Sequence, residues 1–196
     1  TIGPEGNTGW WPNIAFDSKQ VPHVSYCNAH HGNMMYAVRE ADGSWRIEVV
    51  NNDGAVGKYA SMAIAPNDQP AVAYYDQTMK YLRYSYRTPE GWQHEKVAWG
   101  LEVGMGSSLS FDKSGRAHLF YYLPSGKFAY ARRDAPKQWT KKVITFAQRP
   151  HVRDDGGGAA LGSSHTGNPP ALPPSHVRKS GSRWRRRQFG GGSCRK

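Results

Sequence analysis

Three tryptophans, Trp45, Trp92 and Trp139, recur along the chain at a constant spacing of 47 residues. Each lies at the same place in a longer, imperfect repeat of four short segments. A repeat of this length indicates a fold that stacks copies of one small unit, because a single copy cannot bury its own apolar faces. The repeat therefore limits the possible folds more than any other feature of the sequence.

The four segments of each copy alternate apolar and polar residues and are bounded by Gly, Pro, Asp and Asn, which indicates half-buried β-strands. In the first copy we expect strands near residues 12–17, 22–28, 33–39 and 45–50. Equivalent tyrosines occur in the second segment (Tyr26, Tyr74 and Tyr121) and in the third segment (Tyr36, Tyr84 and Tyr130). We interpret these tyrosines and the three tryptophans as a repeated core between adjacent copies.

Four strands per copy predict the blade of a β-propeller, a small antiparallel sheet that packs face to face on its neighbours. The predicted fold class is all-β: a partial β-propeller of three consecutive four-stranded antiparallel blades. The blades are expected at residues 12–56, 57–103 and 104–147, after the end of a preceding blade and a linker at residues 1–11. Because closed propellers usually have roughly four to eight blades, we expect the chain to be a fragment of a longer array.

The fourth segment of each copy is the most charged, with Glu48, Glu95 and the pair Lys141 and Lys142. Charge on a strand discourages pairing with another chain. We therefore place the fourth segment at the outer edge of its sheet.

The repeat stops near residue 147, and residues 148–196 are rich in Gly, Pro, Ser and Arg. This segment carries a net charge of +8, whereas residues 1–147 carry only +3 of the total of +11. We predict a disordered basic tail, because so few apolar residues cannot offset the entropy of ordering. Two interpretations remain open: an arm that binds nucleic acid through Arg185–Arg187, or an out-of-frame product, which we favour.

Residues 1 to about 146 resemble the tandem propeller repeats of about 47 residues found in many secreted or surface-exposed bacterial and archaeal proteins. The resemblance is carried by the segments Ser108-Leu109-Ser110-Phe111-Asp112, Pro22-His23-Val24-Ser25-Tyr26 and Pro70-Ala71-Val72-Ala73-Tyr74-Tyr75-Asp76, and by the pairs Trp45 with Glu48 and Trp92 with Glu95. It implies the propeller fold and an extracellular or cell-surface location. It implies no particular activity, since fold does not determine function.

Polar side chains near the ends of strands are the candidate ligand-binding residues. An arginine follows the third-segment tyrosine by three residues in every copy, which gives Arg39, Arg87 and Arg133. Arginine suits bidentate recognition of a carboxylate, although its recurrence in every blade favours a structural role. Asn28 and Asp76 occupy equivalent positions after the second segment and complete the candidate set.

No pattern of catalytic or metal-binding residues stands out. The segment from Ser110 to Gly115 has one residue too many before the glycine to match the Asp-box of sialidases. His30 and His31 are adjacent, so their side chains point apart and lack a third ligand at metal-site spacing. We therefore expect no catalytic residue, no metal and no cofactor in this chain.

The predicted function is that of a non-catalytic binding or interaction module, with a carbohydrate or protein ligand. The alternative is a fragment of a sialidase-like or other glycosidase propeller whose catalytic residues lie outside this chain. We also expect self-association through open blade faces, nucleic-acid binding only through the tail, and no membrane span, since no apolar run reaches about 18 residues.

Overall fold

The computed structural model describes residues 8–145, which all belong to one folded unit. Within these residues the chain forms twelve β-strands and no helix. The strands pair into three four-stranded antiparallel sheets, in which strands consecutive in sequence are neighbours. This arrangement confirms the predicted fold class of three consecutive propeller blades.

The strand bounds follow the repeat closely. The first sheet consists of β1 (Trp10–Phe16), β2 (Pro22–Asn28), β3 (Asn33–Arg39) and β4 (Trp45–Asn51). The second consists of β5 (Val56–Ile64), β6 (Pro70–Asp76), β7 (Tyr81–Thr88) and β8 (Gly91–Trp99). The third consists of β9 (Ser108–Phe111), β10 (Ala117–Tyr122), β11 (Phe128–Ala135) and β12 (Gln138–Ile144).

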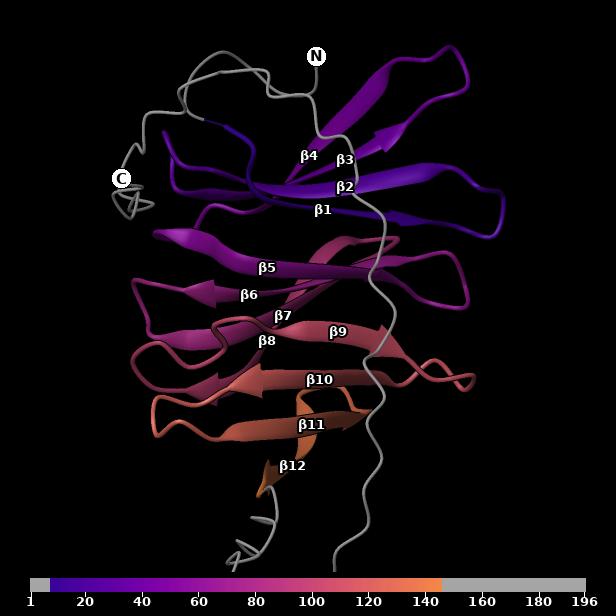
Figure 1. The fold of residues 1–196 in the computed structure, drawn as a ribbon. Helices are drawn as coiled ribbons and strands as arrows, with labels where there is room; N and C mark the ends of the chain where they lie inside the picture. The colour runs from indigo at the N-terminus through magenta and orange to yellow at the C-terminus, as the bar shows by residue number, and fades with distance from the viewer. Residues whose placement is uncertain (1–7, 146–196) are drawn as a thin grey trace, which may run out of the picture. The chain divides into compact units, whose positions relative to one another are not determined.

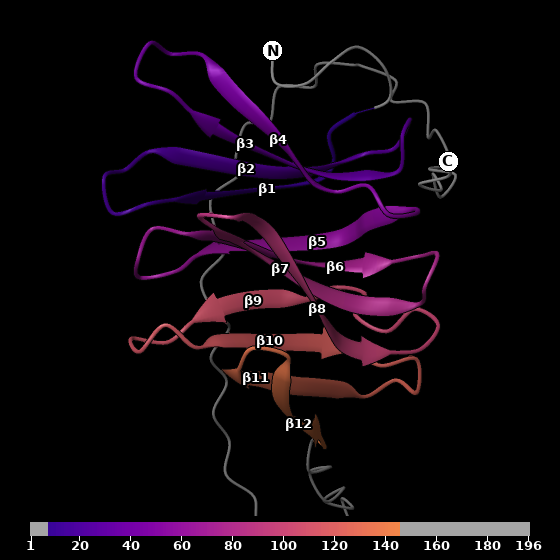
Figure 2. The ribbon, with the colours of Figure 1, turned by 180° about the vertical axis from the view of Figure 1, so that it is seen from behind.

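The three sheets stack face to face in chain order, as Figures 1 and 2 show from opposite sides. Their first strands lie against one another: the Asn13 side chain donates a hydrogen bond to the Ala60 carbonyl (2.8 Å), and the Leu109 amide donates one to the Ser61 hydroxyl (3.0 Å). We call the face of each sheet that is turned toward the preceding sheet its upstream face, and the opposite face its downstream face.

Two apolar clusters fill the spaces between the sheets. Between the first and second sheets lie Met34, Tyr36, Val38, Val50, Val56, Met62, Val72 and Tyr74. Between the second and third lie Ala71, Ala73, Leu82, Tyr84, Val97, Val103, Leu109, Ala117, Leu119, Tyr121, Ala129 and Ala131. The second-strand tyrosines Tyr26, Tyr74 and Tyr121 lie at the same depth, with exposed fractions of 3%, 0% and 2%.

A β-bulge near the start of the first strand recurs in the second sheet. The strand β1 begins at Trp10, two residues before the predicted position, because a shift of register between Trp10 and Asn13 extends its pairing to Cys27. Trp11 and Tyr59 occupy equivalent bulge positions with positive φ angles of 49° and 54°, and their rings lie 5.4 Å apart. The bulges therefore help to align consecutive sheets.

Glycine is required where the chain enters the third sheet. Gly104 has a φ angle of +95°, a conformation that residues with a Cβ rarely adopt. A Cβ atom at this position would also lie 2.7 Å from Cδ1 of Leu82, in the core between the second and third sheets. Any larger residue would thus strain the backbone and displace the core.

The basic tail predicted for residues 148–196 lies outside the described residues, as do residues 1–7. Over residues 8–145, the structure contains no helix that is long and apolar enough to span a membrane.

The fully buried Tyr74 has its hydroxyl in a network of hydrogen bonds. Asn51 Nδ2 donates to this hydroxyl (2.8 Å), and Ser85 Oγ lies 2.9 Å from it. Burial raises the pKa of Tyr74 to about 12, although these hydrogen bonds oppose the shift. By contrast, the buried hydroxyl of the equivalent Tyr26 has no hydrogen-bond partner among the described residues.

The substitution Tyr74→Phe should destabilise the chain by about 1–2 kcal/mol, because it leaves two buried polar groups with one partner fewer. The matched variant Tyr26→Phe should change stability little, because that hydroxyl makes no hydrogen bond within residues 8–145. Urea unfolding of both variants tests the difference. Equal losses would show that the Tyr74 network does not stabilise the stack.

Candidate functional site

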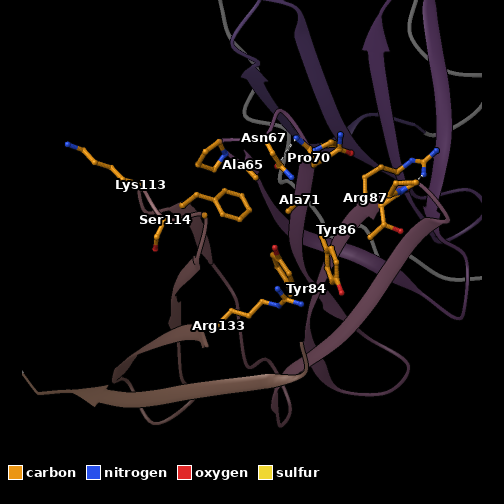
Figure 3. A pocket seen from close by; sticks show the side chains of 16 residues that line it. Ala65, Asn67, Pro70, Ala71, Tyr84, Tyr86, Arg87, Lys113, Ser114 and Arg133 are labelled. Carbon is orange, nitrogen blue, oxygen red and sulfur yellow. Dashed lines mark hydrogen bonds between the residues drawn. The ribbon is translucent and has the colours of Figure 1, made fainter. Parts of the chain in front are cut away.

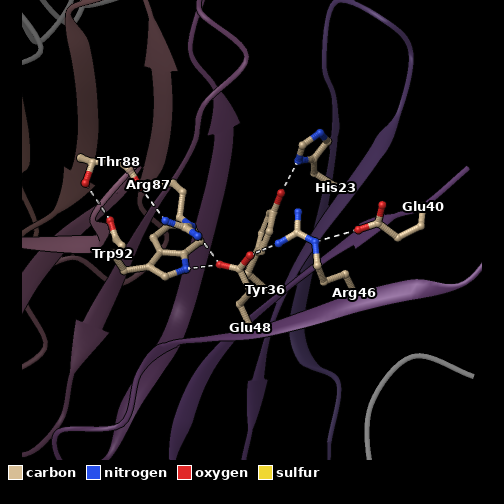
Figure 4. Close-up of polar contacts among 9 residues, drawn as sticks. His23, Tyr36, Glu40, Arg46, Glu48, Arg87, Thr88 and Trp92 are labelled. Carbon is tan, nitrogen blue, oxygen red and sulfur yellow. Dashed lines mark hydrogen bonds and ion pairs between the residues drawn. The ribbon is translucent and has the colours of Figure 1, made fainter.

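A glutamate of the fourth strand joins each of the first two sheets to the next one. In Figure 4, Glu48 of β4 accepts hydrogen bonds from Arg87 Nε (3.0 Å) and Trp92 Nε1 (2.9 Å), both of the second sheet. Arg46 contacts its other carboxylate oxygen. We call this set of one glutamate and the following arginine and tryptophan the glutamate clamp.

The second clamp is more deeply buried. Glu95, which is 3% exposed, accepts hydrogen bonds from Arg133 Nη2 (2.6 Å) and Trp139 Nε1 (2.9 Å) of the third sheet. Burial by itself raises the pKa of the Glu95 carboxyl, but the Arg133 and Trp139 hydrogen bonds outweigh it and hold the pKa below its ordinary value. The carboxylate therefore stays charged inside the interface.

The clamps explain why charge recurs on the fourth strand. The fourth strands do lie at the edges of their sheets, as predicted. Glu48 and Glu95 nevertheless face the next sheet and are paired there, so their charges do not lie in open solvent. Arg87 and Arg133, two candidate ligand-binding residues, form these pairs. The third, Arg39, is exposed and lies over the Trp45 ring at 5.4 Å.

Asn28 and Asp76, the remaining candidates, are buried and lie at the far end of the second strand. Asn28 accepts hydrogen bonds from the backbone amides of His30 and His31, which fixes the turn between β2 and β3. Asp76 is fully buried, and its Oδ2 forms an ion pair with Arg83 Nε at 2.6 Å. Its Oδ1 accepts a hydrogen bond from the Met79 backbone amide. The structure does not bring either residue together with the arginines of the clamps.

On the downstream faces of the first and third sheets, an aspartate, a histidine and the third-strand tyrosine (Tyr36 or Tyr130) lie in contact in that order. In the third sheet, His118 lies 2.6 Å from the Tyr130 hydroxyl and 3.1 Å from Asp112 Oδ2. In the first sheet, His23 lies 2.5 Å from the Tyr36 hydroxyl, and its other ring nitrogen lies 3.5 Å from Asp17.

The second sheet has alanines at both of these positions. Ala65 replaces the aspartate and Ala71 the histidine, which leaves more room above Tyr84 than above Tyr36, where a cavity of about 300 Å³ remains beside His23. A cavity of about 520 Å³ occupies this space between the second and third sheets. We call it the interblade groove.

Aromatic and amide side chains line the interblade groove (Figure 3). Tyr84 forms its buried floor, and Tyr86 stacks on Tyr84 with ring centroids 5.5 Å apart at an angle of 24°. Phe111 of the third sheet is partly exposed on another wall. Arg133 lies 4.6 Å from the Tyr86 ring centroid and is already paired with Glu95, so its charge is compensated.

The rim of the groove is polar and carries no acid. Asn67, Gln69 and Thr88 of the second sheet, with Lys113 and Ser114 of the third, supply amide, hydroxyl and ammonium groups. None of the lining residues is an aspartate, glutamate, histidine or cysteine. The groove can therefore form hydrogen bonds and ring contacts, but its walls hold no carboxylate, imidazole or thiol.

Serine–histidine chemistry has no site among the described residues either. The Ser85 hydroxyl lies 2.8 Å from His94 Nδ1, but Ser85 is fully buried under Tyr74 and cannot reach a substrate. The pKa of His94 is lowered mainly by burial and to a smaller extent by the nearby charge of Arg83. Residues 8–145 contain no group of three or more side chains that could hold a metal ion.

The sequence candidates did not include the residues that create the groove, namely Ala65, Ala71, Tyr86 and Phe111. A signal for them exists in the repeat: aspartate and histidine alternate with alanine between copies, and Tyr86 stands where the first copy has Val38. These departures from the repeat point to a binding site only once the cavity above Tyr84 is known.

No protein-family model matches the sequence, and no curated protein matches it. Among solved structures, the chain is similar to a protein of Bacteroides eggerthii described as a bifunctional GH43-CE, with 14% sequence identity and a TM-score of 0.46. The match covers 70% of this chain and 20% of that protein, so the chain spans about a fifth of its length. The function of the groove is therefore inferred from its own side chains.

The substitution Glu95→Ala should lower the free energy of unfolding by about 3 kcal/mol, because it leaves the partly buried Arg133 charge and the Trp139 indole N–H without their partner. The control Glu40→Ala removes an exposed ion pair with Arg46 and should cost under about 1 kcal/mol. Denaturant unfolding at neutral pH measures both. Similar losses would contradict a structural role for the clamp.

The clamp should also make stability depend on pH. Because folding lowers the pKa of Glu95, its contribution is present above the ordinary glutamate pKa and is lost as the pH falls through the lowered value. When the pH is lowered below about 5, the free energy of unfolding should therefore fall less for the variant Glu95→Gln than for the native chain. Unfolding curves at several pH values test this, and identical pH profiles would contradict it.

Proposed function

We propose that the chain is a non-catalytic binding module and that the interblade groove binds a carbohydrate. The observation that carries the proposal is the combination of a stacked tyrosine pair, Tyr84 and Tyr86, with an amide and hydroxyl rim and no carboxylate. A volume of about 520 Å³ is large enough for a small ligand.

A sugar matches this combination in shape and chemistry. One face of a pyranose ring carries C–H groups that pack on an aromatic ring, while its hydroxyls both donate and accept hydrogen bonds. Tyr86 and Phe111 provide the ring surfaces. Asn67 and Gln69 provide amides that can both donate and accept, as a ring of hydroxyls requires.

The charges of the groove favour a neutral sugar. Arg87 and Arg133 are already paired with Glu48 and Glu95, so neither brings an uncompensated charge to the ligand. Lys113 is exposed at the rim, where solvent screens its charge. Affinity should therefore come mainly from ring contacts and hydrogen bonds.

The composition of the groove opposes hydrolysis. Glycosidases commonly use two carboxyl groups that flank the scissile bond, and the groove has none. The proposal therefore assigns to this site binding without bond cleavage. A carbohydrate ligand also agrees with the extracellular or cell-surface location that we propose from the resemblance of the repeat.

Binding to an array of neutral and acidic oligosaccharides, followed by calorimetric titration of the strongest hit, tests the proposal. The double substitution Ala65→Asp with Ala71→His gives the second sheet the side chains that stand at these positions in the first and third, and the equivalent cavity of the first sheet is only about 300 Å³. It should abolish binding while the chain stays folded. Tyr86→Val, which places the residue of the first sheet there, should weaken binding at least about tenfold.

Phe120→Ala is the matched control, because Phe120 stacks on Phe128 in the third sheet, away from the groove. It should leave the affinity unchanged. Binding that survives the groove-filling substitutions, or the absence of binding to any oligosaccharide, would refute the carbohydrate site. Release of reducing sugar from a bound oligosaccharide would instead favour an enzyme.

A further inference from the structure

The two end faces of the three-sheet stack differ in chemistry. The upstream face of the first sheet carries four exposed apolar side chains, which are Ile14 (61%), Phe16 (54%), Ile47 (39%) and Val49 (46%). They share one face because Ile14 pairs with Val24, Val24 with Ala37, and Ala37 with Ile47 across the sheet. This is the same face that in the second and third sheets packs on the preceding sheet.

Half of a glutamate clamp lies on the same upstream face. Arg39 is paired across the strands with Trp45, as Arg87 is with Trp92 in the second sheet. In the second and third sheets, the arginine and tryptophan converge on a glutamate of the preceding sheet. Arg39 forms no ion pair with any residue among 8–145.

The downstream face of the third sheet lacks the other half. Glu48 lies opposite Tyr36 and Glu95 opposite Tyr84, but the residue opposite Tyr130 is Lys142. If a second copy docked head to tail, Lys142 would meet Arg39, and like charges at a closely packed interface oppose association. The third sheet also has Arg132 where the first has Val38, so this face is more polar.

We propose that the upstream face of the first sheet docks a further four-stranded blade that presents a glutamate to Arg39 and Trp45. The apolar side chains supply the area to be buried, and the arginine and indole N–H select a carboxylate at one position of the outer strand of the partner. The two clamps within the chain provide the geometry. Lys142 excludes the third sheet of a second copy from this role.

The substitution Lys142→Glu turns the chain into a probe for this surface, because its third sheet then presents the missing carboxylate. Lys142 is exposed, so the fold should tolerate the change. Sedimentation velocity of the full chain should show head-to-tail association that is at least about tenfold tighter than in the native chain. Lys141→Glu is the control, since it changes the net charge equally on the opposite face of β12.

A second substitution shows whether the gain arises at the proposed surface. Arg39→Ala combined with Lys142→Glu should return association to the native level, and Ile47→Lys should do the same by charging the apolar face. Equal association of the Lys142→Glu and Lys141→Glu variants would overturn the proposal. A gain in association that survives Arg39→Ala would also overturn it. Tight association of the native chain that Ile47→Lys abolishes and Lys142→Glu leaves unchanged would indicate pairing of two upstream faces, and it would overturn the proposal too.

Discussion

The structure depends on the covering of sheet faces. A four-stranded sheet with apolar side chains on both faces cannot bury them alone, so each sheet is stable only against its neighbours. The glutamate clamp adds a chemical condition to this packing, because a buried carboxylate such as Glu95 is tolerated only when hydrogen bonds replace the lost water. Arg133 and Trp139 of the next sheet provide them. Each interface therefore requires both shape and the correct residue at one register position.

Departures from the repeat create the groove to which we assign ligand binding. The repeated pattern of tyrosine, tryptophan, arginine and glutamate serves mainly to pack the sheets together. The second sheet departs from this pattern at Ala65 and Ala71, where small side chains replace an aspartate and a histidine. In the cavity above Tyr84, a stacked aromatic pair meets a polar rim. The third sheet departs from it at Lys142, which changes what can pack on its outer face.

The same repeat gives the two ends of the stack different properties. Open faces at both ends predict association, but four exposed apolar side chains and the half-clamp lie on the first sheet, whereas the third sheet presents Lys142 and Arg132 beside Phe120. The two outer faces therefore differ, which makes the stack directional.

The sequence by itself determined the number of strands, the bounds of those in the first sheet to within about two residues and the equivalence of Tyr26, Tyr74 and Tyr121. Alternation and a fixed period are local properties of the chain. It also indicated that Arg87 and Arg133 are structural, since they recur in every copy. Only the tertiary structure decided that Glu48 and Glu95 face the next sheet rather than solvent, and that Ala65, Ala71 and Tyr86 frame a groove. These outcomes depend on contacts between sheet faces whose residues lie about 40 positions apart in the sequence. No periodic pattern within one copy specifies those contacts.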